Sequence, residues 1–260
     1  MPSPANPPKK RLGQHFLKDP NTARVVAAGV TREDVVLEIG PGRGFLTTFL
    51  AQRAKLVYAV ELDPDVLPAL RRAVGDNVRI HEGNALRFDY EALEPAPNKL
   101  VANLPYNIAS PLVLMLLERA HRLEHLRFMV QLEVARRMAA ARGTKDYAAY
   151  AALIQLLAEV RIAHRVSPNV FDPPPRVDSA VVDMERRSPG LEPAEYRGVK
   201  QLVLAAFRSR RKHLINNLPE PARGEAPHAL SSLGYGPDAR AEELGPEDFV
   251  ALYRAVAWVF

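Results

Sequence analysis

The sequence contains no cysteine among its 260 residues. This absence excludes a disulfide framework, a cysteine-ligated zinc site and a thiol nucleophile. The seven histidines show no metal-ligand spacing, so we expect no metal. No apolar run reaches the length of a membrane span, and the basic start MPSPANPPKK lacks the apolar region of a secretory signal. We therefore expect a soluble cytoplasmic protein without membrane association.

Basic residues are in moderate excess, with 35 Lys and Arg against 30 Asp and Glu and a formal charge of +5. They gather in two stretches, PPKKRLGQHFLK near the start and FRSRRKH at 207–213. Clustered positive charge favours a polyanionic partner. A solvated helix face is the alternative for such a run.

Short β-rich runs alternate with helical stretches over the first half of the chain. We expect strands at 35–40, 56–63, 78–84, 99–105 and 127–133, with helices after the first, second and fourth. This alternation predicts a parallel sheet covered on both faces. The runs AEVRIAHRVSP and VDSAVVDMERR predict a final antiparallel pair, and the chain beyond SPGLEP (188–193) is predicted to be helical.

The predicted organisation therefore has three parts. Residues 1–10 are basic and Pro-rich, and we expect them to be disordered. Residues 11–188 form an α/β domain, and residues 193–260 form a smaller helical domain. No internal repeat is evident.

A glycine-rich turn closes the first predicted strand. Gly40 and Gly42 let the backbone turn tightly and approach a ligand, and Glu38 precedes them. The dinucleotide fingerprint G-x-G-x-x-G is broken because position 45 is Phe, which weakens a nicotinamide interpretation. A tight turn without a ligand is the structural alternative.

The next two strand ends carry polar side chains that suit a nucleoside. Glu61 stands about 20 residues beyond the turn, where a carboxylate accepts both ribose hydroxyls. Asp63, followed by Pro64, is assigned to helix capping. Asn84 offers its amide to an adenine edge, or serves as a turn residue. Three strand ends facing one crevice favour a nucleoside cofactor.

The fourth strand ends in Asn103, Leu104, Pro105 and Tyr106, a combination that folding alone does not require. The exocyclic amine of a nucleobase is a poor nucleophile because its lone pair is delocalised into the ring. Asn103 Oδ1 and the Leu104 carbonyl, held by the rigid Pro105, would accept hydrogen bonds from the amine and localise that pair. Tyr106 would stack on the base. The alternative places Asn103 in a loop and Tyr106 in the core.

The chain resembles the ribosomal RNA adenine N6,N6-dimethyltransferases of the small subunit. The resemblance covers residues 11–218 and rests on the segments RLGQHFLKD, VVLEIGPGRGFLT, YAVELDPD, NLPYNIASP, FDPPPRVDSAVV and FRSRRKHLINNL, which occur in family order. It implies S-adenosylmethionine as methyl donor and a class I Rossmann-like methyltransferase domain with a small all-helical C-terminal domain. It also implies, as the target, adenosines in a loop near the 3′ end of 16S rRNA.

The resemblance implies roles for individual residues as well. The donor-binding positions of the family fall on His15, Leu17, Gly40, Glu61, Asn84 and Asn103. Phe171 is implied to face Tyr106 across a flipped adenine, in a pocket walled by Pro173 to Pro175, with core packing as its alternative. Three features depart from the usual family pattern: His15 in place of Asn, Asn84 in place of Asp, and YAAYAAL at 147–153.

The resemblance further implies methylation of N6 of two adjacent adenosines during small-subunit biogenesis, and we expect the methyl groups to be transferred in line. Arg208, Arg210, Arg211 and Lys212 are expected to contact rRNA phosphates, with help from Lys9, Lys10 and Arg11. The basic run leaves Leu202, Val203, Ala206, Leu214 and Leu218 to face a core. The expected partner is 16S rRNA within an immature 30S subunit, bound by a monomer.

Three alternatives remain open at this point. The macrolide-resistance adenine methyltransferases of the large subunit share the glycine-rich turn and an N-[LI]-P-Y motif, although FRSRRKHLINNL fits the small-subunit group better. A role in ribosome assembly or nucleic-acid binding on the same fold is the second alternative. A nicotinamide-dependent oxidoreductase is the third.

Overall fold

The computed structural model describes Lys9 and residues 13–256. Two predictions lie outside the described residues. They are the disorder of residues 1–10, apart from Lys9, and the RNA contacts of Lys10 and Arg11. In the part of the chain that is described, no helix has the length and apolar character needed to cross a membrane.

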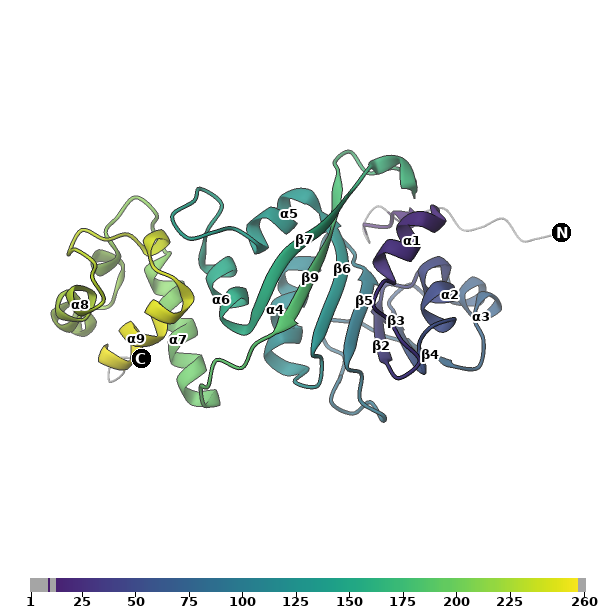
Figure 1. Ribbon diagram of the computed structural model, residues 1–260, viewed down its shortest axis with the longest axis horizontal. Helices are drawn as coiled ribbons and strands as arrows, with labels where there is room; N and C mark the ends of the chain where they lie inside the picture. Colours follow the sequence, from purple (N-terminus) through teal and green to yellow (C-terminus); the bar gives the residue numbers. More distant parts are fainter. Residues whose placement is uncertain (1–8, 10–12, 257–260) are drawn as a thin grey trace. The chain divides into compact units, whose positions relative to one another are not determined.

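The described chain contains strands, α-helices and short 3-10 helices (Figure 1). The strands are β1 (Phe16–Leu17), β2 (Val35–Ile39), β3 (Leu56–Glu61), β4 (Val78–Glu82), β5 (Lys99–Asn103), β6 (His125–Gln131), β7 (Ala158–Val166), β8 (Phe171–Asp172) and β9 (Ser179–Arg186). The α-helices are α1 (Pro20–Val26), α2 (Phe45–Ala51), α3 (Leu67–Ala73), α4 (Ala109–Arg119), α5 (Leu132–Met138), α6 (Ala149–Leu157), α7 (Pro193–Ala206), α8 (Glu220–Ser232) and α9 (Pro246–Val256). The 3-10 helices are η2 (Pro168–Val170), η3 (Leu214–Asn217) and η4 (Ala241–Glu243).

The main sheet has the strand order β4-β3-β2-β5-β6-β9-β7. The strands from β4 to β6 run parallel to one another, and β9 pairs antiparallel with β6. In the register of the central strands, Leu37 stands between Tyr58 and Leu100. The expected strands are therefore present, and the switch in strand order lies between β2 and β5. Ligands of open α/β sheets bind at such a switch point, outside the carboxyl ends of the strands.

Burial explains why the central strands read as continuous apolar runs. Every residue of β2 and β3 is buried, whereas the edge strand β4 has no buried residue. Strands covered on both faces are apolar throughout, because neither face meets water. Figure 1 shows the two covering layers, with α1, α2 and α3 on one side of the sheet and α4 on the other.

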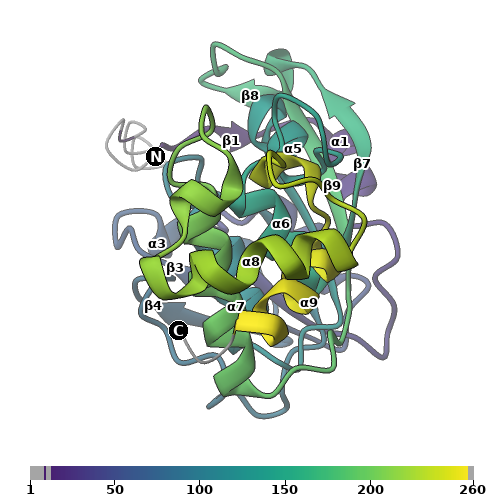
Figure 2. The same ribbon diagram turned by 90° about the vertical axis from the view of Figure 1, so that its left-hand side faces the viewer.

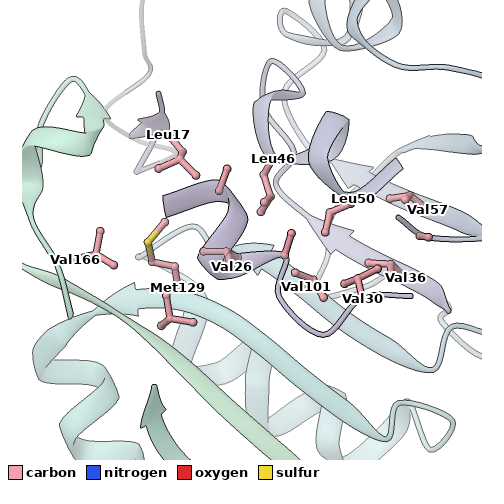
Figure 3. Close-up of a cluster of buried hydrophobic side chains, with 14 of the residues drawn as sticks. Leu17, Val26, Val30, Val36, Leu46, Leu50, Val57, Val101, Met129 and Val166 are labelled. Atoms are coloured by element: carbon pink, nitrogen blue, oxygen red, sulfur yellow. The ribbon is translucent and has the colours of Figure 1, made fainter. Parts of the chain in front are cut away.

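One buried cluster joins the N-terminal segment to the sheet (Figure 3). Leu17 of β1 and Val26 of α1 pack with Leu46 of α2 and Met129 of β6. The small sheet of β1 and β8 adds to this cluster, since Leu17 pairs with Phe171. These contacts place residues 13–18 beside the carboxyl ends of the strands.

The chain divides into two compact units. The first comprises residues 1–135 and 160–186, and the second comprises residues 136–159 and 187–260. The predicted boundaries differ, because a domain over 11–188 places residues 136–159 in the first unit. These residues belong with the C-terminal helices since the apolar helix α6 packs on α7 and α9. Figure 2 shows α7, α8 and α9 of the second unit together.

The predicted helix through FRSRRKH ends earlier than expected. Helix α7 stops at Ala206, and the Asn217 amide donates to the carbonyls of Ala206 (2.7 Å) and Ser209 (3.0 Å). A side chain that satisfies the last helical carbonyls stabilises a helix end. The five apolar residues expected to face a core, Leu202, Val203, Ala206, Leu214 and Leu218, are all buried. The basic residues thus stand in a loop between α7 and η3, termed the basic loop (208–212).

Candidate functional site

A cavity of about 510 Å³ opens at the carboxyl ends of β2, β3 and β5, in the first unit. This volume lies in the usual range for small-molecule and cofactor sites. The predicted donor-binding residues all line it, namely His15, Leu17, Glu38, Gly40, Gly42, Glu61, Asn84 and Asn103. Leu104, Pro105 and Tyr106 line it as well. The structure therefore brings together segments that lie far apart in the sequence.

The glycine-rich turn depends on glycine for two reasons. Gly40 and Gly42 have φ of 70° and 58°, in the left-handed region that side chains disfavour. A Cβ on Gly42 would lie 2.9 Å from Phe16 Cε1, and one on Gly40 would lie 3.0 Å from Pro105 Cγ. The turn is consequently packed against both the N-terminal segment and the end of β5.

Glu61 is the last residue of β3, and its carboxylate accepts hydrogen bonds from backbone N–H groups. Its Oε2 accepts from Gly42 N at 2.9 Å, and its Oε1 accepts from Asp63 N at 2.8 Å. Burial raises the pKa of Glu61, and the backbone donors of Asp63, Gly42 and Leu62 oppose that rise. Because each carboxylate oxygen has a second lone pair, these bonds leave acceptor capacity toward the cavity. The ribose contact of Glu61 stays a prediction.

Glu38 is the other buried carboxyl of the cavity. It is 1% exposed, and its Oε2 has no hydrogen-bond partner among the described residues. Burial raises the pKa of Glu38 to about 8, with the neighbouring Glu61 adding to the rise. At neutral pH the folded protein therefore holds Glu38 largely as the uncharged acid.

We expect Glu38→Gln to be increasingly stabilising, relative to the wild type, as pH rises from 5 to 8. In this window the wild type keeps a proton on Glu38 when folded and releases it when unfolded. The free energy of unfolding of the wild type therefore falls as pH rises. The variant has no such group, and the difference should grow by at most about 1.4 kcal/mol per pH unit. Urea unfolding at several pH values measures it. The exposed Glu33→Gln is the matched control, and parallel stability curves for Glu38→Gln and the wild type would contradict the assignment.

Asn84 makes the turn contact that was one of the two roles considered for it. Its Oδ1 accepts from Leu86 N at 3.0 Å, which is the turn contact. The residue is exposed and also lines the cavity. The contact of Asn84 with an adenine edge stays a prediction.

Asn103 presents an unpaired acceptor to the cavity. Its Nδ2 donates to the His15 carbonyl at 3.1 Å, while its Oδ1 is buried and finds no partner in the described part of the chain. Leu104 is 1% exposed, and its N–H donates to the Met129 carbonyl at 3.1 Å. An unsatisfied buried acceptor is costly, so an acceptor left without a partner on a residue that lines the cavity is consistent with a ligand donor there.

Tyr106 is fixed by two neighbours. Its hydroxyl shares a hydrogen bond of 2.6 Å with the buried Ser179 Oγ, and its ring stacks on His15 with centroids 5.6 Å apart. Burial raises the pKa of the Tyr106 hydroxyl, so the ring stays neutral. His15 Nδ1 donates to the Pro173 carbonyl at 2.8 Å, because a carbonyl oxygen can only accept.

Phe171 is buried in the core. It is 0% exposed, belongs to the same buried cluster as Leu17 and is not among the residues that line the cavity. Among residues 171–175, Asp172 alone belongs to the lining, so Pro173 to Pro175 do not form the predicted wall. This burial accords with core packing, the alternative for Phe171, and its contact with a flipped adenine stays a prediction. In the β1–β8 pairing Phe171 is the register partner of Leu17, and both residues belong to one buried cluster.

Sequence reasoning missed several cavity residues of the N-terminal segment and the turn. The Arg43 guanidinium lies 4.5 Å from the centroid of the Phe16 ring, and both residues line the cavity together with Gln14 and Lys18. Their signal in the sequence was their place within RLGQHFLKD and between the glycines. That position gave no indication of which side chains would face the cavity.

The proposed RNA contacts belong to the second unit. Arg208, Arg210, Arg211 and Lys212 are all exposed on the basic loop. Arg210 Nη2 donates to the Tyr147 carbonyl at 3.3 Å, and Tyr147 is buried against Phe207. The segment 147–153, which departs from the usual family pattern, therefore contacts the basic loop through Tyr147 and continues into α6. Across Lys9 and residues 13–256, no cluster of three or more His, Cys, Asp or Glu could hold a metal ion.

Comparisons with known proteins show the family of the chain. The model of the ribosomal RNA adenine dimethylase family matches residues 5–257. The ribosomal RNA small subunit methyltransferase A of Rubrobacter xylanophilus is 73% identical over 252 residues, covering 96% of this chain and 95% of the relative. The protein of the same name from Thermobifida fusca is 43% identical and covers 94% and 89%.

Solved structures give the same result. A dimethyladenosine transferase from Plasmodium falciparum has a TM-score of 0.80 at 26% identity, with 92% of this chain and 96% of that chain covered. The 23S rRNA methyltransferase ErmE has a TM-score of 0.73 at 28% identity, covering 93% and 99%. The predicted fold class and the predicted resemblance are confirmed. The chain belongs to the ribosomal RNA adenine dimethylase family.

Proposed function

We propose that the protein dimethylates N6 of two adjacent adenosines in a loop near the 3′ end of 16S rRNA, with S-adenosylmethionine as methyl donor. The observation that carries the proposal is the buried, unpartnered Oδ1 of Asn103 beside the glycine-rich turn. The small-subunit assignment is supported by relatives named for the small subunit at 73% and 43% identity, against 28% for the large-subunit enzyme ErmE.

The cavity fits a nucleoside-containing donor. Gly40 and Gly42 leave its floor free of side chains, and Glu61 and Asn84 offer polar groups from neighbouring strand ends. Leu17 supplies an apolar wall. S-adenosylmethionine supplies, when bound, an electrophilic methyl group on a sulfonium. Glu61 would hold its ribose and Asn84 its adenine edge.

The end of β5 would prepare the nucleophile. Asn103 Oδ1 and the Leu104 carbonyl accept hydrogen bonds from the N6 amine and localise its lone pair. Pro105 limits backbone motion at this point, and Tyr106 stacks on the target base. In-line transfer would form the N6–CH3 bond as the S–CH3 bond of the sulfonium breaks, leaving S-adenosylhomocysteine, and N6 would lose one proton to water. Repetition on the monomethylated amine gives the dimethylated product.

The partner and the cellular setting complete the proposal. The substrate would be 16S rRNA within an immature 30S subunit in the cytoplasm, bound by a monomer through the exposed cations of the basic loop. Phosphate contacts of this kind are sequence-independent and weaken with salt.

Methyl transfer from radiolabelled S-adenosylmethionine tests the function. Undermethylated 30S particles, 50S particles and their free RNAs would be incubated with the protein, digested with nuclease and separated as nucleosides. We expect label in N6,N6-dimethyladenosine from the 30S particles. Label confined to the 50S particles or their RNA would move the protein to the macrolide-resistance enzymes. Donor binding without label in any adenosine would leave a binding protein on this fold.

A further inference from the structure

Asp63 has more polar contacts than a helix cap requires. It is 2% exposed and follows β3. Its Oδ1 accepts from Lys9 Nζ at 2.5 Å and from Asp65 N at 3.2 Å, and its Oδ2 accepts from Gln14 Nε2 at 2.8 Å. The contact with Asp65 N is the local turn contact, whereas the other two reach the N-terminal segment. Helix α3 begins at Leu67 with Val66 as its N-cap, so the cap role predicted for Asp63 is wrong, and the carboxylate instead bonds the N-terminal segment.

Both ends of the Gln14 amide are committed to the same network. Gln14 Oε1 accepts from Lys9 N at 2.7 Å, while Nε2 donates to Asp63. The orientation of the amide is therefore fixed, because reversing it would set donor against donor and acceptor against acceptor. A buried carboxylate with cationic and amide donors is a strong attachment, since breaking it would leave an unpaired charge.

The attached segment is the one that covers the cavity. Gly13, His15, Phe16 and Leu17 all line it. His15 immediately follows Gln14, and its carbonyl accepts from Asn103 Nδ2 at 3.1 Å. That bond uses the donor end of the Asn103 amide and turns Oδ1 away from His15. A continuous path of hydrogen bonds and one peptide link thus runs from Asp63 to the acceptor that the reaction needs.

We propose that Asp63 is a positioning residue, which holds residues 13–17 over the cavity through Gln14 and Lys9 and so fixes the orientation of the Asn103 amide. The kinetic consequence rests on the proposed function, whereas the attachment itself does not. Asp63 touches neither the donor nor the base in this scheme and acts only through the N-terminal segment.

The test compares Asp63→Asn with Asp65→Asn in the full-length protein. Asp63→Asn keeps the shape but places an NH₂ group against the donors of Gln14 or Lys9. Asp65→Asn is the matched control, because Asp65 also contacts Lys9 Nζ, at 2.5 Å, but is 44% exposed and makes no contact with Gln14. Gln14→Met is a second variant that removes the link without burying a charge, in case Asp63→Asn fails to fold.

Three readouts are combined. Hydrogen exchange of the peptide covering residues 13–18 reports the attachment without any ligand. Calorimetric titration with S-adenosylhomocysteine reports donor-site affinity, and methylation of 30S particles gives kcat and the KM for RNA. We expect faster exchange, roughly tenfold weaker binding and roughly tenfold lower kcat for Asp63→Asn and Gln14→Met, with KM for RNA unchanged. Asp65→Asn should remain within about twofold of the wild type.

The outcomes separate this inference from the proposed function. Equal effects of Asp63→Asn and Asp65→Asn would overturn it, as would unchanged exchange of residues 13–18 in both Asp63→Asn and Gln14→Met. A general loss of folded protein would lower the binding stoichiometry and leave the Kd of the remainder unchanged, which also contradicts a positioning role. If the wild type methylates no rRNA, the proposed function fails, while exchange and titration still decide the role of Asp63.

Discussion

Asn103→Ala is expected to lower kcat for methyl transfer by roughly 10²–10³-fold, the usual effect of removing one preorganised polar group from a reacting centre. The reason is that Oδ1 is a buried, unpartnered acceptor at the end of β5, and alanine leaves the N6 amine without it. Single-turnover methylation of 30S particles, with saturating donor and particle, measures the chemical step apart from binding. The KM for RNA should change much less than kcat, because the acceptor acts on the amine and not on the rRNA backbone.

Asn103→Asp distinguishes the acceptor role of the Asn103 side chain from its donor role. Aspartate keeps an acceptor at Oδ1 but loses the donor that bonds the His15 carbonyl. If the acceptor carries the effect, Asn103→Asp should retain at least tenfold more activity than Asn103→Ala. Equal loss in both variants would instead assign the effect to the His15 contact. An Asn103→Ala protein that keeps a third or more of the wild-type kcat would refute the assignment of Asn103 to the nucleophile.

The grouping of the strand ends at one site could be predicted because it follows from a general property of parallel sheets. Apolar runs of strand length alternated with helices, and parallel strands bring their carboxyl ends to one edge. Residues as distant as Glu38, Glu61 and Asn103 could therefore be assigned to one site from the sequence alone. The left-handed φ of Gly40 and Gly42 adds a reason for these glycines that the motif alone did not contain.

What the sequence could not indicate depended on partners far along the chain. The strands β1 and β8 contain two residues each, and no local pattern predicts that Leu17 pairs with Phe171. The burial of Phe171 follows from that pairing. The partners of Asp63 could not be predicted for the same reason. Asp followed by Pro satisfies the signature of a cap and gives no indication of Lys9 or Gln14 as partners.

The two carboxyls at the end of β3 show how position decides the charge state. Burial raises the pKa of Glu61, whose partners are backbone amides. Burial acts in the same direction on Asp63, but the bonds from Lys9 and Gln14 lower its pKa below the ordinary value. An anion held by a cation is well suited to a structural attachment, whereas a carboxyl with spare acceptor capacity is suited to a ligand hydroxyl.

The second large effect is expected from removing charge on the basic loop. The combined variant Arg208→Gln, Arg211→Gln and Lys212→Gln should bind 30S particles roughly 10²-fold more weakly at moderate salt, because three exposed cations no longer displace counterions from phosphate. Arg210 is left in place since it also donates to the Tyr147 carbonyl. Titration at several salt concentrations should show the slope of log K against log salt reduced by about 2 to 3.

A charge-preserving variant distinguishes phosphate contact from folding. Arg208→Lys, Arg211→Lys and Lys212→Arg keep all three cations and should retain a salt slope close to that of the wild type, since the counterion term depends on charge. S-adenosylhomocysteine binding should be the same in both combined variants, because the cavity lies in the first unit and the basic loop in the second. An unaltered slope in the glutamine variant would show that the rRNA phosphates are bound elsewhere. A slope reduced equally in both would mean that the shape of the loop, and not its charge, is what the rRNA recognises.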